Sequence, residues 1–157
     1  RLIAALGRNP RAEEVGPVEL NGAARQAARL AGIEPIIEGE ATAWVAASLL
    51  ARALDNLFGN LAGAWREAGP VSPVLRLQAA PEVPNSVEME FHCPWPPGIS
   101  ALAEEKIFEP FASGRPTGLG LGLYQARKSL REAGGDLRAR STDDGLSFLL
   151  RLPAGPP

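Results

Sequence analysis

Several features are missing from this 157-residue chain, and each absence excludes a kind of site or segment. A single cysteine, Cys93, permits neither an internal disulfide nor a cysteine-based zinc site. No apolar run is long enough to cross a bilayer, and the first residues show no signal-peptide pattern. The sparse cysteine usage fits a reducing compartment. We therefore expect a cytoplasmic location, which is compatible with membership of a membrane-anchored receptor.

The chain also lacks a strong excess of either charge. Its net charge is −2, from 16 basic and 18 acidic residues. Without a broad basic surface we expect neither nucleic-acid binding nor direct membrane contact from this segment. The basic residues Arg127, Lys128 and Arg131 are expected to form a solvated helix face. Hydrophobic residues make up 45% of the chain, enough for the core of one domain, in which we expect the tryptophans to pack.

Three glycines at alternate positions, Gly118, Gly120 and Gly122, open a predicted helix from Leu119 to about Ala133. Glycine is unfavourable inside a helix, so three at its start need a reason. One reason is that backbone N–H groups and the positive end of the helix dipole approach an anion. The alternative is a turn that only lets the helix pack closely. No Gly-Lys-Ser/Thr is present, which excludes a P-loop, and the glycines follow a loop rather than a strand, which argues against a dinucleotide fold.

A pair of asparagines, Asn56 and Asn60, lies within a predicted helix from about Thr42 to Ala68. Residues four apart share one helix face. The apolar stripe beside them consists of Leu49, Leu50, Ala53, Leu54, Leu57, Leu61 and Ala64. Because Asn is a mediocre helix former, two beside such a stripe indicate a function. The alternative is a solvated pair on the outer face.

The other segments mix helices and strands. Asn21 is expected to cap a helix over residues 22–31. The predicted strands are residues 15–20, 33–37, 74–79, 87–91, 136–141 and 146–152. Asp143-Asp144-Gly145 is a hairpin signal between the last two. The pattern predicts an α+β fold: a two-layer α/β sandwich whose mixed, mostly antiparallel sheet is covered by three helices.

The sequence Ile-Phe-Glu-Pro-Phe at 107–111, a short polar loop and Gly-Leu-Gly-Leu-Gly-Leu-Tyr at 118–124 resemble the ATP lid and second glycine box of sensor histidine kinases. The segment around Asn56 and Asn60 resembles their N-box. The resemblance spans nearly the whole chain and implies the Bergerat ATP-binding fold. It implies three parts: residues 1–14 as the end of a helical dimerisation hairpin or a linker, 15–153 as the ATP-binding catalytic domain, and 154–157 as a tail. We expect the proline-rich tail to be disordered.

The resemblance also implies a site for ATP and Mg²⁺. In it Asn60 holds the metal and Asn56 supports it, since an amide oxygen is a suitable hard ligand. The implied ATP-binding residues are Asn56, Asn60, Gly98, Ile99, Phe108, Phe111, Arg115, Thr117, Gly118, Leu119, Gly120, Leu121 and Gly122. The loop 112–117 would close as a lid anchored by Phe108 and Phe111, although core packing explains these two rings equally well. Arg115 either reaches the γ-phosphate or is solvated.

The first glycine box departs from the family pattern. Relatives have Asp-x-Gly-x-Gly, in which the carboxylate accepts a hydrogen bond from the adenine amino group. Here Pro94 stands in the Asp position and Pro96 in that of the first glycine, and only Gly98 and Ile99 remain. Proline has neither a carboxylate nor an N–H group. We expect a damaged adenine pocket, a largely intact phosphate pocket, and weak binding of ATP and Mg²⁺.

Two functional hypotheses remain open. In the first, the chain is the catalytic domain of a two-component sensor histidine kinase. It supplies a phosphoryl group to a histidine on a helical hairpin, in the same or a partner chain, for a response regulator. The only histidine here, His92, is expected to make an ordinary hydrogen bond, so the chain should not be active alone. In the second, it is a nucleotide-deficient module that docks a response regulator or partner kinase. A gyrase-like or mismatch-repair ATPase is disfavoured, because those families need a Glu near the N-box and only Asp55 adjoins Asn56.

Overall fold

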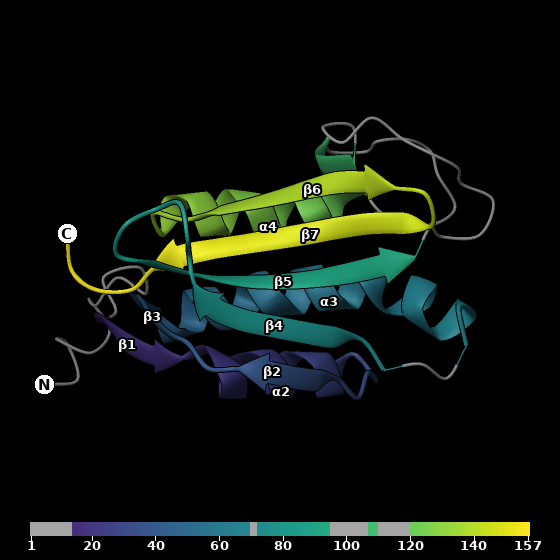
Figure 1. The fold of residues 1–157 in the computed structure, drawn as a ribbon, viewed down its shortest axis with the longest axis horizontal. Coiled ribbons are helices and arrows are strands. Elements are labelled where there is room, and N and C mark those ends of the chain that lie inside the picture. The colour runs from purple at the N-terminus through teal and green to yellow at the C-terminus, as the bar shows by residue number, and fades with distance from the viewer. Residues whose placement is uncertain (1–13, 70–71, 95–106, 110–119) are drawn as a thin grey trace, which may run out of the picture.

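The computed structural model describes residues 14–69, 72–94, 107–109 and 120–157, with only the backbone described at 120–122. Figure 1 shows two layers, a five-stranded sheet in front and helices behind it. The sheet has the order β2–β4–β5–β7–β6, in which β2 and β4 are parallel and the other pairs antiparallel. This arrangement confirms the predicted fold class.

The bounds of β4, α4, β6 and β7 lie within one residue of those that the sequence predicted, whereas β5 extends three residues beyond its predicted end. The strands of the sheet are β2 (Ile36–Gly39), β4 (Val74–Ala79), β5 (Ser86–Pro94), β7 (Gly145–Pro153) and β6 (Asp136–Thr142). The helices are α2 (Leu20–Leu30), α3 (Ala47–Glu67) and α4 (Gly120–Glu132). A separate two-stranded antiparallel ribbon pairs β1 (Val15–Glu19) with β3 (Thr42–Ala46).

The core lies between the sheet and the helices. Alternate residues of β5 and β7 point inward, and the other residues of each strand point to the open face. Four aromatic rings pack in sequence through this layer, Trp65 and Phe58 from α3 against Phe91 and Phe148. The rings of Phe91 and Phe148 are stacked, with centroids 5.2 Å apart. The centre of α3 is thereby fixed against the middle of the sheet.

The predicted helix over residues 42–68 is wrong at its start. Thr42–Ala46 forms β3, which pairs with β1 from Val15↔Ala46 to Glu19↔Thr42, and α3 begins only at Ala47. Trp44 and Val45 are common in strands and have only moderate helix propensity, so the local sequence is compatible with either structure. Pairing with β1, which lies more than twenty residues earlier in the chain, decides in favour of the strand.

Asn21 does not cap a helix, contrary to the sequence prediction. Helix α2 begins at Leu20, with Glu19 at the N-cap position and no side-chain cap. The Asn21 amide instead donates to the Gly39 carbonyl at 2.7 Å and accepts from the Ala41 N–H at 3.2 Å. An amide side chain can serve a donor and an acceptor together, and here it closes the connection between β2 and β3.

Two further boundaries differ from the prediction. The strand expected at 33–37 begins at Ile36, because the N–H of Ile33 still bonds to the Ala28 carbonyl at the end of α2 (2.8 Å). The tail expected to be disordered is held in place at Ala154 and Gly155. The N–H of Ala154 bonds to the Asn85 carbonyl at 2.8 Å, and the Asn85 side chain donates to the Gly155 carbonyl at 3.4 Å.

Candidate functional site

Helices α3 and α4 lie side by side on the same face of the sheet (Figure 1). The apolar stripe of α3 is buried from Leu50 onward, as predicted. Asn56 and Asn60 lie at the border of this stripe, and both are half-buried. The asparagine pair therefore lies on a helix that packs beside the glycine-box helix, on the same side of the sheet.

The glycine box itself is described only in part. Helix α4 begins at Gly120 and includes Leu121 and Gly122 in its first turn. The first turn of a helix leaves backbone N–H groups without partners inside the helix, which is the donor set that a phosphate group needs. Several predicted site residues lie outside the described part of the chain: Gly98, Ile99, Phe111, Arg115, Thr117, Gly118 and Leu119.

Phe108 is buried, with 2% of its surface exposed. Its burial agrees with both interpretations of the ring, packing in the core and anchoring a lid. The guanidinium of Arg127 lies 4.0 Å from the centre of its ring. Arg127 on α4 was expected to be a solvated residue, and this cation–π contact corrects that prediction. The contact fixes the segment containing Phe108 against α4. Lys128 pairs with Glu132 at 3.3 Å, as expected of a solvated helix face.

His92 and Cys93 point to opposite faces of β5, as consecutive strand residues must. The His92 imidazole is on the open face, where its Nε2 lies 3.3 Å from the Asp144 carboxylate. This is the ordinary contact that the sequence predicted. Cys93 is 1% exposed, and burial raises the pKa of its thiol to about 12. Neither residue faces the helix layer as a reactive group.

Strand β5 is longer than the sequence indicated and includes Pro94, which pairs with Gly145 of β7. Strand β4 pairs with β5 only as far as Arg76↔Glu90, so the last residues of β5 have a strand on one side alone. The carbonyl of His92 points to the side without a strand, where it accepts a hydrogen bond from the indole N–H of Trp65. Two residues on, the missing N–H of Pro94 falls on that same side. Proline is tolerated there because no ladder bond is lost.

The described residues include no group of three or more His, Cys, Asp or Glu side chains placed to hold a metal ion. A metal at this site would therefore rely on amide oxygens such as that of Asn60 and on the phosphates of a nucleotide, which is a common arrangement for Mg²⁺. Within the same described part, no helix is long and apolar enough to cross a membrane.

Comparison with known families identifies the chain. The family described as histidine kinase-, DNA gyrase B- and HSP90-like ATPases matches residues 46–156, from the end of β3 to the C-terminal segment. The chain belongs to this ATPase family. The match contains both the asparagine pair and the glycine box, and it confirms the resemblance that these two motifs suggested.

Curated relatives of this ATPase domain are bacterial sensor proteins. The two-component sensor PprA of Pseudomonas aeruginosa is 39% identical over 115 residues, which are 70% of this chain and 11% of that protein. The sensory histidine kinase/phosphatase NtrB of Rhodobacter capsulatus is 42% identical over 60 residues, or 38% of this chain and 17% of that protein. The chain thus spans less than a fifth of the length of either relative.

Solved structures share the fold. The mycobacterial sensor histidine kinase MprB superposes with a TM-score of 0.66 at 22% identity, covering 92% of this chain and all of that one. Full-length ShkA in complex with AMPPNP gives a TM-score of 0.67 at 24% identity, covering 98% of this chain and 34% of that one. At such identities the likeness concerns the arrangement of helices and strands.

Proposed function

We propose that this ATPase-family chain is the ATP-binding catalytic domain of a two-component sensor histidine kinase with an altered adenine contact. One observation carries the proposal: α3, with Asn56 and Asn60 at the edge of its buried face, packs beside α4, which begins within the glycine box. The side chains of Asn56 and Asn60 and the N-terminus of α4 thus lie in the same helix layer, on the side of the sheet opposite its open face.

Each group has a separate role in this proposal. The amide oxygen of Asn60 is a ligand for Mg²⁺, and Asn56, one turn earlier, supports it. The backbone N–H groups at the start of α4 bind the phosphates. Bound Mg²⁺ supplies charge neutralisation on the phosphate oxygens. Because phosphoryl transfer depends mostly on position and charge, these residues need to hold the nucleotide and little else.

The phosphoacceptor lies outside this chain in the proposal. His92 is the only histidine in the sequence, and it lies on the open face of the sheet, away from α3 and α4, in contact with Asp144. A γ-phosphate held between the two helices would not reach it. We therefore infer that a histidine on a helical hairpin, in the same protein or a partner, receives the phosphoryl group and passes it to a response regulator.

Pro94 supports a second candidate, a module of the same fold that has lost useful nucleotide affinity and docks a response regulator or partner kinase. The residue is part of β5 and offers no carboxylate to adenine. Loss of a hydrogen bond to a charged acceptor weakens binding by roughly 1.5–3 kcal/mol, or about ten- to a hundredfold. Residual phosphate binding distinguishes the two candidates.

Calorimetric titration with a non-hydrolysable ATP analogue, with and without Mg²⁺, tests the proposal. We expect weak, Mg²⁺-dependent binding, with the corresponding GTP analogue competing within a small factor. Asn60→Ala should weaken both nucleotides by about tenfold or more. Asp55→Asn, an exposed substitution on the same helix, should leave binding unchanged.

Other outcomes have definite meanings. No binding at millimolar nucleotide would favour the docking module. Tight binding selective for adenine would show that another group reads the base. The chain alone should not label itself with γ-labelled ATP, and acid-labile phosphate on His92 would contradict transfer to an outside histidine.

A further inference from the structure

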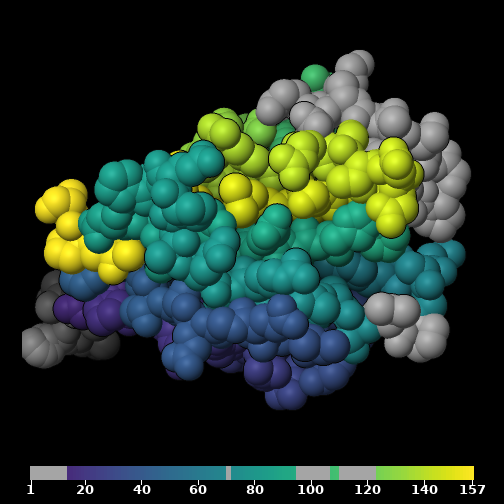
Figure 2. Space-filling view, viewed as in Figure 1, coloured from purple at the N-terminus to yellow at the C-terminus, as the bar shows by residue number. Residues whose placement is uncertain are grey.

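A pocket of about 490 Å³ opens on the sheet face opposite the helices. Most of its polar lining comes from outward-pointing positions of three neighbouring strands: Arg76 of β4, Glu90 and His92 of β5, and Ser147 of β7. Ser72 and Asp144, which precede β4 and β7, complete it. In the space-filling view of Figure 2 this sheet face is seen directly, with β7, β5, β4 and β2 at the surface. The pocket therefore opens on the side of the sheet away from α4, although Trp65 of α3 and Ala68 at the end of that helix also line it.

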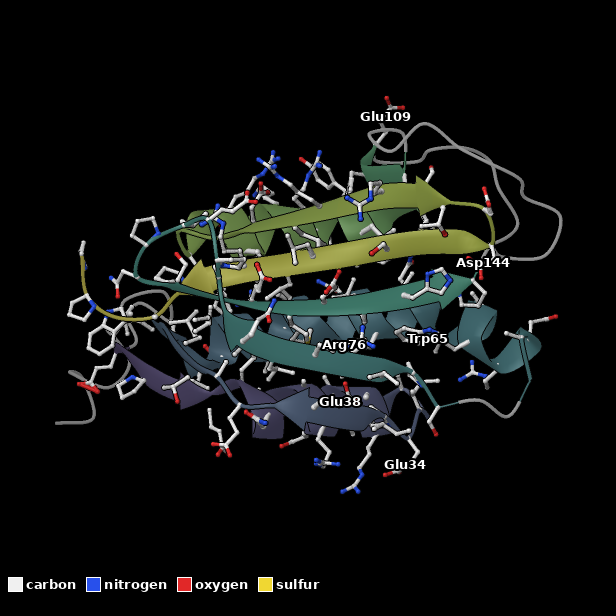
Figure 3. The ribbon with its side chains drawn as sticks, in the orientation of Figure 1. Glu34, Glu38, Trp65, Arg76, Glu109 and Asp144 are labelled. Atoms are coloured by element: carbon white, nitrogen blue, oxygen red, sulfur yellow. The ribbon has the colours of Figure 1, made fainter. Side chains whose placement is uncertain are left out.

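The pocket exists because β4 and β5 separate at one end. Strand β4 begins at Val74 but its ladder with β5 begins at Arg76↔Glu90. Trp65, whose labelled position in Figure 3 lies between these two strands, reaches into the gap from α3. The apolar lining consists of Trp65, Ala68, Pro73, Val74, Phe91 and Pro94. A volume of several hundred Å³ with one apolar side suits a small organic molecule.

The charged side chains around the pocket differ in whether they already have an oppositely charged or hydrogen-bonding partner. Arg76 is paired with Glu38 at 3.2 Å, and Asp144 lies 3.3 Å from the His92 imidazole. Figure 3 labels Arg76, Glu38 and Asp144. Glu90 makes no hydrogen bond or ion pair with any side chain of the described residues, although it is half-buried at the centre of the sheet face. The unengaged charge beside the apolar wall is thus a carboxylate.

We propose that this pocket binds a small organic cation with a planar aromatic body, such as an aryl amidine or an arylalkylamine. The ring lies against Trp65 and the two prolines, Pro73 and Pro94, and the cationic group donates to the Glu90 carboxylate. A half-buried carboxylate gains a partner in this complex, and charge-assisted hydrogen bonds are stronger than neutral ones. An anion of the same shape would meet the Glu90 and Asp144 carboxylates instead, and the basic groups that would favour it, Arg76 and His92, already contact Glu38 and Asp144.

Three probes of one shape and different charge test the class of ligand. Benzamidine is cationic, benzamide is neutral and benzoate is anionic. With the ¹⁵N-labelled 157-residue chain, we expect benzamidine to shift the Trp65 indole N–H and the His92 amide in a saturable way. Benzamide should bind about tenfold more weakly, and benzoate should produce no saturable shift.

Two variants of equal charge change locate the cationic group. Glu90→Gln keeps the shape of the pocket and should reduce benzamidine affinity by about tenfold. Glu82→Gln removes the same charge from the exposed loop between β4 and β5, where the residue does not line this pocket, and should leave affinity unchanged. Unaltered amide spectra of both variants show that each remains folded.

The proposal is overturned if benzamide and benzoate bind as tightly as benzamidine, or if Glu90→Gln and Glu82→Gln behave alike. Benzamidine shifts confined to residues of α3 and α4 other than Trp65 would also overturn it, since they would place the probe on the other side of the sheet. Pro94 is common to both proposed sites, but Glu90 lines only this pocket among the two, so the effect of Glu90→Gln on benzamidine affinity tests this proposal separately from nucleotide binding.

Discussion

The indole Nε1 of Trp65 donates a hydrogen bond to the backbone carbonyl of His92 at a distance of 3.0 Å. The bond joins the last turns of α3 to β5 at the point where β4 no longer pairs with that strand. The Trp65 side chain thus supplies the hydrogen bond that a neighbouring strand would otherwise donate to the His92 carbonyl. Because Asn60 lies five residues before Trp65 on the same helix, this contact also fixes where the asparagine pair stands relative to the end of β5.

Trp65→Phe is expected to lower the free energy of unfolding by about 1–2 kcal/mol, because the ring is partly retained while the His92 carbonyl loses its donor. Urea unfolding followed by circular dichroism measures the change. Trp44→Phe is the matched control, since Trp44 is half-buried and its indole makes no hydrogen bond with the described residues. Equal effects of both substitutions would show that ring volume, rather than the hydrogen bond, accounts for the loss.

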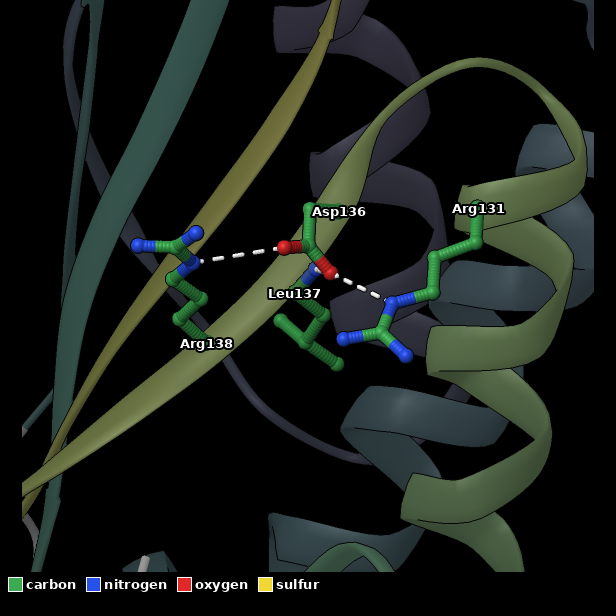
Figure 4. Close-up of polar contacts among 4 residues, drawn as sticks. All are labelled: Arg131, Asp136, Leu137 and Arg138. Atoms are coloured by element: carbon green, nitrogen blue, oxygen red, sulfur yellow. Dashed lines mark hydrogen bonds and ion pairs between the residues drawn. The ribbon is translucent and has the colours of Figure 1, made fainter. Parts of the chain in front are cut away.

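Asp136 joins α4 to the first residues of β6 (Figure 4). Its carboxylate accepts from Arg131 at 2.8 Å, from the Leu137 N–H at 2.8 Å and from Arg138 at 3.3 Å. Burial acts to raise the pKa of this carboxyl group, but the hydrogen bonds from these three donors outweigh it and hold the pKa below 3.8. We expect Asp136→Asn to destabilise the fold by about 1–2 kcal/mol at neutral pH.

The same group predicts a pH dependence. A carboxylate whose pKa is lower in the folded state stabilises the fold above its ordinary value of 3.8, and this contribution is lost as the pH falls through the depressed folded-state pKa. The stability difference between the unaltered chain and Asp136→Asn should therefore shrink below about pH 4. Asp143→Asn, in the exposed β6–β7 turn, should show no such convergence. A difference that stays constant from pH 7 to pH 3 would contradict the assignment.

Two glycines on the exposed face of α3, Gly59 and Gly63, have no close neighbour: a Cβ added at either position would meet no atom within 4 Å. Glycine inside a helix is less favourable than alanine by roughly 0.5–1 kcal/mol. Gly59→Ala and Gly63→Ala should each raise the midpoint of thermal unfolding. At Gly145 the opposite holds, since a Cβ would collide with the Cys93 carbonyl, and Gly145→Ala should unfold at lower temperature.

Cys93 should be unreactive in the folded protein. It is 1% exposed, and its pKa is raised to about 12, so the thiolate that attacks disulfide reagents is scarce and inaccessible. Ellman's reagent should release no colour from the native chain at neutral pH and one equivalent after denaturation in urea. Rapid labelling without denaturant would show that the end of β5 opens readily.

Local signals determined much of the fold. The strand at Val74–Ala79, the hairpin turn at Asp143–Asp144 and the buried stripe of α3 were predictable, because alternation, turn residues and helical periodicity act within a few neighbours. For the candidate site, the sequence placed Asn56 and Asn60 on one helix face and a second helix start at the glycine box. Those two features also led to the ATPase family.

Tertiary structure decided the rest. Thr42–Ala46 became a strand because β1 offers it a ladder, and Asn21 left the helix cap because Gly39 and Ala41 present it with an acceptor and a donor. The Trp65–His92 bond and the Arg127–Phe108 contact join residues 27 and 19 positions apart, and a tryptophan or arginine alone indicates no such partner. Local propensities differ by only about 1 kcal/mol between helix and strand, so a few contacts with distant segments are enough to override them.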